Sequence, residues 1–244
     1  MTDVYWLEQT EEDMPVTDDW LSTNEAVFLH GMRFAKRRAD WRLGRWTAKL
    51  ATAIYSGMSM GREGLRRIEI LPDASGVPKV FCDNEPSSLC ISLSHRAGMA
   101  ICALAPSGIE LGCDLEFIET RSDSFLTDYF TAEEQEWVAQ FAPAARSQLL
   151  ALLWSAKESA LKALHAGLRL DTREVSVSVA DFGLSDSGSH AWRSLQVCYK
   201  NKWIFRGWWQ QTGNFVRTVV SAPPPPAPIF LKIRALESTP AIPA

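Results

Sequence analysis

The sequence lacks the marks of a disulfide-bonded, zinc-binding or membrane protein. Its five cysteines include no C-x-x-C pair, and their odd number suits neither a disulfide framework nor a zinc ribbon. No apolar run approaches the roughly 18 residues of a membrane span, and the N-terminus is acidic rather than basic and then apolar. We therefore expect reduced, buried thiols and a cytoplasmic protein that does not enter a membrane.

The sequence also lacks an excess of positive charge. The net charge of −4 argues against a general nucleic-acid-binding surface, which needs clustered lysine and arginine. The chain has neither a Walker A loop nor a G-x-G-x-x-G loop after a strand, so side chains would have to hold any nucleoside phosphate. One local exception can receive a small polyanion: residues 33–45 contain Arg33, Lys36, Arg37, Arg38, Arg42 and Arg45.

What the sequence does contain is the material of a folded core. Apolar residues make up 46% of its 244 residues, and ten of them are tryptophan. Capping boxes at Ser22–Glu25 and Thr131–Glu134 predict two helix starts. Periodic apolar residues predict longer helices from about Asp40 to Gly57 and from about Ala144 to His165. Short β-type runs predict strands at 68–71, 79–82, 89–93, 99–104, 108–116, 175–179, 195–199, 203–208 and 215–220.

The second half of the chain repeats the plan of the first. Trp46-Thr47-Ala48-Lys49 and Trp154-Ser155-Ala156-Lys157 stand 108 positions apart, each on a predicted helix that strands follow. We therefore predict an α+β fold of two similar lobes, residues 1–106 and 107–222, related by a pseudo-two-fold axis. The proline-rich tail, residues 223–244, is expected to be extended or disordered and unable to continue a sheet.

Three acidic residues are candidate metal ligands. Asp114 and Glu116 are two apart on a predicted strand, so their carboxylates share one face and can approach one hard cation such as Mg²⁺. Glu158 lies on a predicted helix, with Trp154 and Lys162 each four residues away on the same stripe. Taken singly, these acids also fit a solvated strand surface and an ordinary helical Glu–Lys pair.

Several donors can bind phosphate. Ser94 and His95 end a predicted strand, and Arg96 follows them. A nucleophilic Ser–His pair is disfavoured because adjacent side chains on a strand point apart and no G-x-S-x-G elbow surrounds them. Lys79 follows a turn at Gly76–Pro78, and Arg38, Arg42 and Arg45 share one helical face. A structural histidine and a solvated basic stripe are the alternatives.

Three segments, taken in order, resemble the 4'-phosphopantetheinyl transferases of the type that activates surfactin synthetase. They are Ser92-Leu93-Ser94-His95, Gly112-Cys113-Asp114-Leu115-Glu116 and Trp154-Ser155-Ala156-Lys157-Glu158-Ser159-Ala160-Leu161-Lys162. With the basic stretch upstream, the resemblance covers about residues 30–165. It implies a pseudo-dimeric fold like the two lobes predicted above.

The resemblance implies that a monomer transfers 4'-phosphopantetheine from coenzyme A to a serine of an apo acyl or peptidyl carrier protein, releasing adenosine 3',5'-bisphosphate. It implies Mg²⁺ held by Asp114, Glu116 and Glu158, with Glu158 also helping to remove the serine proton. Lys162 would neutralise phosphate charge, and residues 125–134 resemble the carrier-docking region. The residues that would contact coenzyme A are Arg38, Arg45, Lys79, Ser94, His95 and Lys162.

The sequence departs from the family pattern at two positions. Val77 stands where a basic residue is frequent, and Arg96 stands where a small hydroxyl residue often follows the histidine. Two other functions are open. A metal-dependent nuclease would use Asp114 with Glu158, although such enzymes usually carry E-x-K on a strand. A non-catalytic module that binds coenzyme A or a carrier protein would not need all three acids.

Overall fold

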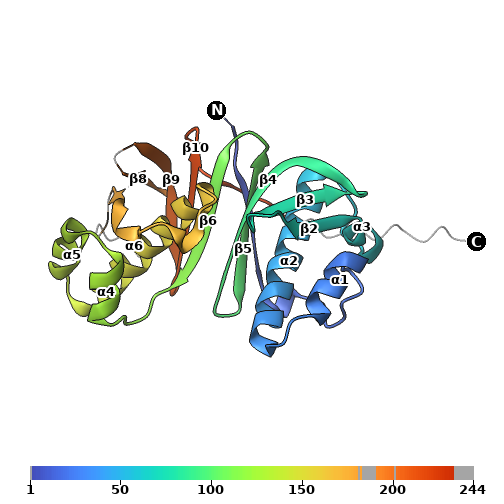
Figure 1. Cartoon of the computed structure of the whole chain (residues 1–244), viewed down its shortest axis with the longest axis horizontal. Helices are drawn as coiled ribbons and strands as arrows, with labels where there is room; N and C mark the ends of the chain where they lie inside the picture. The colour runs from blue at the N-terminus through green and yellow to red at the C-terminus, as the bar shows by residue number, and fades with distance from the viewer. Residues whose placement is uncertain (1, 181, 183–190, 201, 234–244) are drawn as a thin grey trace, which may run out of the picture.

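The computed structural model describes residues 2–180, 182, 191–200 and 202–233. Within these residues two α+β lobes lie side by side, which confirms the predicted fold class (Figure 1). The first lobe contains β1 (Tyr5–Thr10), α1 (Thr23–His30), α2 (Ala35–Ser56), α3 (Arg62–Arg66), β2 (Ile68–Pro72), β3 (Pro78–Cys82), β4 (Glu85–Arg96) and β5 (Met99–Pro106). The second contains β6 (Glu110–Phe117), α4 (Asp123–Tyr129), α5 (Ala132–Ala139), α6 (Pro143–Ala163), β7 (Val175–Val179), β8 (Arg193–Tyr199), β9 (Trp203–Thr212) and β10 (Phe215–Ala222).

The lobes form four layers, with helices on each outer side, led by α2 and α6, and two sheets between them. In the described residues the strand orders are β11-β1-β5-β4-β3-β2 and β6-β10-β9-β8-β7. Strand β11 (Ile229–Phe230) follows the second lobe in the chain but joins the sheet of the first. Helix α2 packs on the first sheet and α6 on the second, and the sheets face each other. Apolar side chains at 101, 103 and 105 of β5 and at 111, 113 and 115 of β6 fill the space between the sheets.

The first two helices follow their local signals, with one correction. Ser22 accepts a hydrogen bond from the backbone N–H of Glu25 at 3.3 Å, and the Glu25 carboxylate accepts one from Ser22 N–H at 3.1 Å. Helix α2 begins at Ala35 rather than at about Asp40, without a side-chain cap and without an acidic residue in its first turn. It ends as predicted at Gly57, whose positive φ of 66° suits glycine.

A buried glutamate–lysine pair is repeated in the two lobes. In the first, Lys49 pairs with Glu25, and Glu25 also accepts a hydrogen bond from Ile70 N–H at 3.0 Å. In the second, Lys157 pairs with Glu134 at 2.7 Å, and Glu134 accepts one from the N–H of residue 177 at 3.0 Å. Each glutamate belongs to a capping box and each lysine ends a W-[TS]-A-K motif, so the weak sequence repeat marks one structural device used twice.

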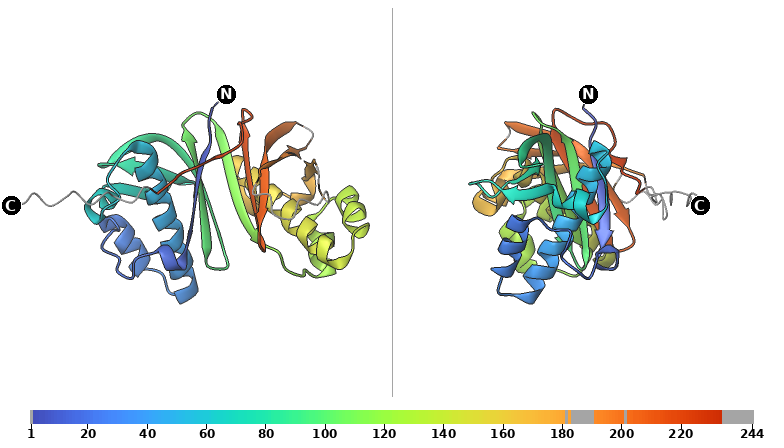
Figure 2. Two further views of the ribbon diagram at one scale, coloured as in Figure 1. Left: turned by 180° about the vertical axis from the view of Figure 1, so that it is seen from behind. Right: turned by 90° about the vertical axis from the view of Figure 1, so that its right-hand side faces the viewer.

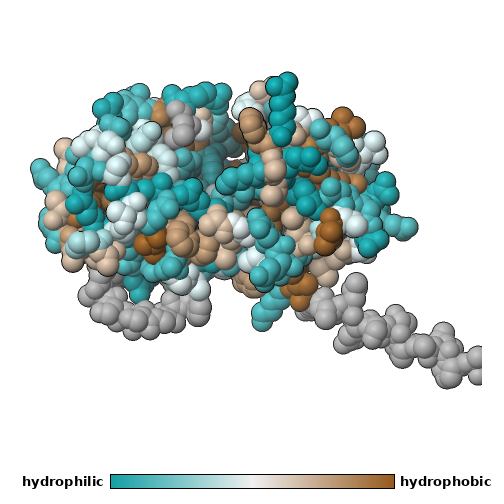
Figure 3. Space-filling view, turned by 90° about the horizontal axis from the view of Figure 1, so that it is seen from below, coloured by the Kyte–Doolittle hydropathy of each residue, from teal (hydrophilic) through white to brown (hydrophobic). Residues whose placement is uncertain are grey.

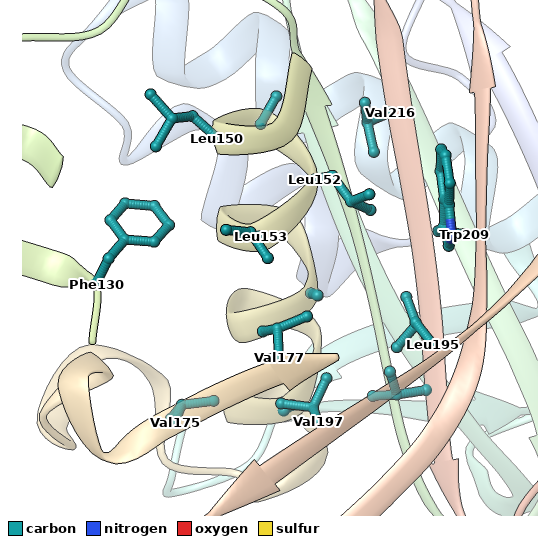
Figure 4. Packing of buried hydrophobic residues seen from close by; sticks show 14 of the residues in the cluster. Phe130, Leu150, Leu152, Leu153, Val175, Val177, Leu195, Val197, Trp209 and Val216 are labelled. Atoms are coloured by element: carbon teal, nitrogen blue, oxygen red, sulfur yellow. The ribbon is translucent and has the colours of Figure 1, made fainter. Parts of the chain in front are cut away.

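The core of the second lobe is built around α6. Its apolar side chains pack against the sheet on one side and against Phe130 on the other (Figure 4). Leu152 lies towards Trp209 and Val216 of the sheet. Because α6 is buried on several faces, its buried polar side chains have partners inside the protein, as Ser155, Lys157 and Ser159 do.

The segment after Ser221 corrects the prediction for the tail. Ile229 and Phe230 pair in parallel with β1, which is the N-terminal strand (Figure 2). Once the proline run has ended at Pro228, backbone N–H groups are available, and Ile229 and Leu231 donate hydrogen bonds to β1 and its flank at 2.9 and 2.8 Å. Leu231 is buried in the core of the first lobe. Residues 234–244 of the predicted tail lie outside the described residues.

One face of the molecule is mainly polar. On the face seen from below, hydrophilic residues predominate and apolar residues are scattered among them (Figure 3). Among the described residues, the structure contains no helix with the length and apolar character needed to cross a bilayer.

Candidate functional site

The site begins where α6 crosses β6 at close range. A Cβ atom on Gly112 would lie 1.8 Å from the backbone oxygen of Ser159, so only glycine allows this approach. Along β6 the residues alternate: Cys113 faces the first lobe, whereas Asp114 and Glu116 face the other way, towards α6. The glycine therefore brings two strand carboxylates against the helix.

Asp114 is the centre of this contact, and it is only 4% exposed. Its Oδ1 accepts hydrogen bonds from Ser94 Oγ of β4 and from Lys162 Nζ of α6, both at 2.7 Å. Its Oδ2 is buried and has no hydrogen-bond partner among the described residues. Three elements from two lobes thus meet at one carboxylate that retains an unused oxygen.

Lys162 supplies the fixed positive charge of the contact. Its ammonium also donates a hydrogen bond to the backbone oxygen of Cys113 at 3.0 Å. Burial is the largest single influence and lowers the pKa of Lys162, but the charge and hydrogen bond of Asp114, together with Cys113 and Glu158, outweigh it, so the net pKa is raised. Lys162 is therefore charged at neutral pH while remaining 27% exposed on its side chain.

Glu116 and Glu158 share the electrostatic environment of Asp114. Desolvation, followed by repulsion from Asp114, raises the pKa of Glu116 to about 7. The pKa of Glu158 is raised by the same two causes in the same order. Glu158 makes no hydrogen bond or ion pair with the described residues. The three predicted acids therefore lie close enough to interact electrostatically, and the two glutamates would ionise more readily beside a cation.

The donor set fits a hard metal ion, although it does not form a closed site. In the described part of the chain, no group of three or more histidine, cysteine, aspartate or glutamate side chains is already arranged to hold a metal. Carboxylate oxygens supplemented by water and phosphate are what Mg²⁺ prefers. The unused Asp114 Oδ2 and the raised pKa of both glutamates are consistent with such an ion.

Two arginines flank Glu116: Arg96, which the sequence offered as a phosphate donor, and Arg121, which it did not single out. Arg121 Nη2 lies 3.1 Å from Glu116 Oε2, and Arg96 Nε lies 3.6 Å from the same oxygen. Both also contact Glu119, at 3.0 and 2.5 Å. Arg96 stands where the family pattern has a small hydroxyl residue, and its role here is to balance the charge of the acidic strand end.

A cavity of about 540 Å³ lies between the lobes beside these groups. Three of the predicted residues line it: Arg45, His95 and Lys162. Arg38 and Lys79 do not, because Arg38 is exposed on α2 and Lys79 turns towards Asp73, with its Nζ 3.7 Å from the carboxylate. Desolvation is the main cause that lowers the pKa of His95, which favours its neutral form at pH 7. The rest of the described lining is Asp40, Trp41, Gly44, Pro72, Ser75, Gly76, Val77, Pro78, Ile91, Ser92, Leu93, Leu111, His165, Ala166, Gly167 and Arg169.

Arg45 has a charged side chain with an unused hydrogen-bond donor, which suits an anionic ligand. Its guanidinium stacks over Trp41 at 4.8 Å, and its buried Nε has no hydrogen-bond partner among the described residues. Desolvation lowers its pKa to about 10, which still leaves it charged. A buried N–H group without an acceptor is costly, and a phosphate oxygen would supply the acceptor that Nε lacks.

Sequence reasoning missed the residues that reach the cavity from segments without a regular period. Arg169 follows α6 in a short 3-10 turn (Gly167–Arg169), and His165 precedes it. Lys36 and Arg37 border a neighbouring hollow together with His95. The basic stretch at 33–45 was recognised as a possible polyanion site, but its spacing did not single out Arg37.

An aromatic cluster adjoins the acidic site on the second lobe. The rings of Phe125 and Tyr129 on α4 lie 5.2 and 5.1 Å from that of Trp154 on α6. Trp154 lies one helical turn before Glu158. Tyr129 is 39% exposed, so the segment predicted to dock a carrier presents an aromatic surface next to the carboxylates.

Comparison with known proteins agrees with this arrangement. Residues 110–208, which include the acidic strand and α6, match the sequence model of the 4'-phosphopantetheinyl transferase superfamily. A holo-[acyl-carrier-protein] synthase of Streptococcus sanguinis is 36% identical over 64 residues, which are 26% of this chain and 53% of that protein. One of Enterococcus faecalis is 30% identical over 81 residues, which are 33% of this chain and 68% of that protein. The chain thus spans about half the length of the first relative and two thirds of the second.

Proposed function

Because this chain belongs to the 4'-phosphopantetheinyl transferase superfamily, we propose that it transfers 4'-phosphopantetheine from coenzyme A to a serine of an apo acyl or peptidyl carrier protein. Adenosine 3',5'-bisphosphate would be the second product. The observation that carries the proposal is the buried Asp114, bound by Ser94 and Lys162 and left with a free oxygen beside a cation-lined cavity. Two lobes in one chain support the monomeric type that activates surfactin synthetase.

Coenzyme A would lie in the cavity between the lobes. Arg45 and His95 would hold its nucleotide end, and Lys162, bound to Asp114, would take the pyrophosphate. Ser94 is buried, and its hydroxyl donates a hydrogen bond to Asp114. We therefore propose that it orients this carboxylate, in addition to the predicted contact with phosphate. Arg38 and Lys79 would have to move to reach the ligand.

Asp114, Glu116 and Glu158 would hold a magnesium ion. When bound, Mg²⁺ would supply charge neutralisation for the pyrophosphate and for the leaving phosphate. Arg121 and Arg96 would keep the Glu116 carboxylate in place at the open edge of the strand. Removing divalent metal should therefore stop transfer and leave the folded chain intact.

The chemistry needs one bond formed and one broken at phosphorus. The carrier serine Oγ would attack the phosphorus that bears the pantetheine group, and the bond from that phosphorus to the bridging oxygen would break. Glu158 would accept the serine proton, since its carboxylate lies on α6 near Asp114 and makes no hydrogen bond or ion pair with the described residues. Lys162 would stabilise the charge that develops on the phosphate oxygens.

The carrier protein would approach over residues 125–134. Phe125 and Tyr129 present aromatic surface beside Trp154, and this surface lies next to Glu158. A carrier bound there would bring its serine towards the carboxylates.

The test is intact-mass measurement of several apo carriers incubated with the protein, coenzyme A and Mg²⁺. We expect a gain of about 340 Da, the mass of the transferred group. EDTA should abolish the gain. Binding of coenzyme A without any gain across the panel would support a non-catalytic binding module instead, and metal-dependent cleavage of nucleic acid would support a nuclease.

A further inference from the structure

The second lobe places a fixed, unpaired cation on the cavity wall. Arg169 lines the cavity, and its guanidinium donates hydrogen bonds to the backbone oxygens of Ala166 and His165 at 2.9 and 2.8 Å. It forms no ion pair with any of the described residues. Arg173, four residues later, instead binds Asp171 at 2.8 Å and does not line the cavity. Of these two arginines, Arg173 is thus neutralised by a carboxylate and Arg169 is not.

Backbone carbonyls hold Arg169 without neutralising it. A long side chain normally loses rotamer entropy when it binds a ligand, and fixing it beforehand reduces that loss. The two carbonyl contacts engage Nε and Nη2 and leave the other guanidinium nitrogen, Nη1, for an anion. Arg169 is therefore a pre-oriented donor that faces a cavity.

The charge of the whole lining supports an anion with more than one charged group. Arg45, Lys162 and Arg169 contribute cations, whereas the one carboxylate among the described lining residues is Asp40. Asp40 is itself paired with Lys36 at 2.8 Å. Lys162 is paired with Asp114 at the acidic strand, whereas Arg169 lies beyond the end of α6 and is positioned to contact a different part of a ligand.

Coenzyme A has two separate anionic groups, a pyrophosphate and a ribose 3'-phosphate. We propose that Arg169 of the second lobe binds the 3'-phosphate together with Arg45 of the first lobe. This inference rests on the proposed function, because it takes coenzyme A as the ligand. The 3'-phosphate would then bridge the two lobes and let the protein distinguish coenzyme A from dephospho-coenzyme A, which lacks that group.

The test is calorimetric binding of coenzyme A and of dephospho-coenzyme A in the absence of carrier protein. Arg169→Gln should weaken coenzyme A binding roughly tenfold and leave dephospho-coenzyme A binding within about twofold, because one charge-assisted contact to the 3'-phosphate is lost. The affinity of Arg169→Lys for coenzyme A should lie between those of the wild type and Arg169→Gln, since a lysine keeps the charge and loses the planar guanidinium. Arg173→Gln changes the net charge equally and should weaken neither ligand.

The outcomes separate this inference from the proposed function. Equal losses for both ligands in Arg169→Gln, or no loss for coenzyme A, would overturn the role of Arg169. Thermal unfolding of each variant shows whether the substitution damages the turn itself. If Arg169→Gln does so, the binding of both ligands by Arg169→Lys tests the role of Arg169 instead. Wild-type protein that binds coenzyme A with this discrimination but modifies no carrier would leave the inference standing and sink the proposed function. Absence of binding by the wild type would overturn both.

Discussion

Replacing Lys157 by methionine should destabilise the protein far more than replacing an exposed lysine in an ion pair of similar length. Lys157 is 0% exposed, contacts Glu134 at 2.7 Å, and donates hydrogen bonds to the backbone oxygens of Thr172 and Val175 at 2.8 and 2.6 Å. Its removal leaves a buried carboxylate without a counter-ion, a change that costs about 3–5 kcal/mol. That is a large share of the 5–15 kcal/mol by which domains are typically stable.

The assay is urea unfolding followed by tryptophan fluorescence, with Lys36→Met as the matched control. Lys36 pairs with Asp40 at 2.8 Å, but its side chain is 86% exposed, so we expect a loss below about 0.5 kcal/mol. Adding Glu134→Gln to Lys157→Met should recover part of the loss, because it removes the unpaired charge and keeps an acceptor for the cap. Equal, small losses for Lys157→Met and Lys36→Met would refute the view that burial decides the cost.

Three further predictions concern the acidic site, the tail and the cavity. The pKa of Glu116 rises from 4.5 to about 7 on folding, so between these pH values the native state binds more protons than the unfolded chain. The metal-free protein should therefore lose up to roughly 3 kcal/mol of stability as the pH rises through this range. Glu116→Gln should flatten this slope in urea unfolding at several pH values, and an unchanged slope would argue against the shift. Leu231→Ala should lower the free energy of unfolding by about 2 kcal/mol if the tail packs as described, whereas a neutral result would place the tail off the core. Arg45→Gln should weaken coenzyme A binding at least tenfold and Arg38→Gln by less than about twofold in calorimetry, and similar losses would contradict their different positions.

Local signals in the sequence were sufficient for most of the fold. The capping box at Ser22–Glu25 and the glycine at 57 are short-range devices, so they locate helix ends correctly. The start of α2 was missed because Ala35 and its neighbours have no side-chain cap and a basic first turn, which local rules disfavour. Strand β11 was missed because its partner β1 lies more than 200 residues away and leaves no periodic trace.

For the site, sequence pattern predicted which residues gather but not how each is used. The alternation of β6 placed Asp114 and Glu116 on one face, and helical spacing placed Glu158 near Lys162. Nothing in the motif separates Lys157, which is sealed in the core, from Lys162, which reaches the carboxylates. Those roles depend on where α6 meets the sheet, a tertiary contact that local rules do not specify.

The most direct test of the account compares wild type, Asp114→Asn and Glu63→Gln in the carrier mass assay with coenzyme A and Mg²⁺. Asp114→Asn keeps the side-chain volume and removes the charge, while Glu63 is exposed on α3, away from the cavity lining. We predict the gain of about 340 Da for wild type and Glu63→Gln, and none for a folded Asp114→Asn protein. Transfer by Asp114→Asn at the wild-type rate would contradict the central claim that this carboxylate organises the active site.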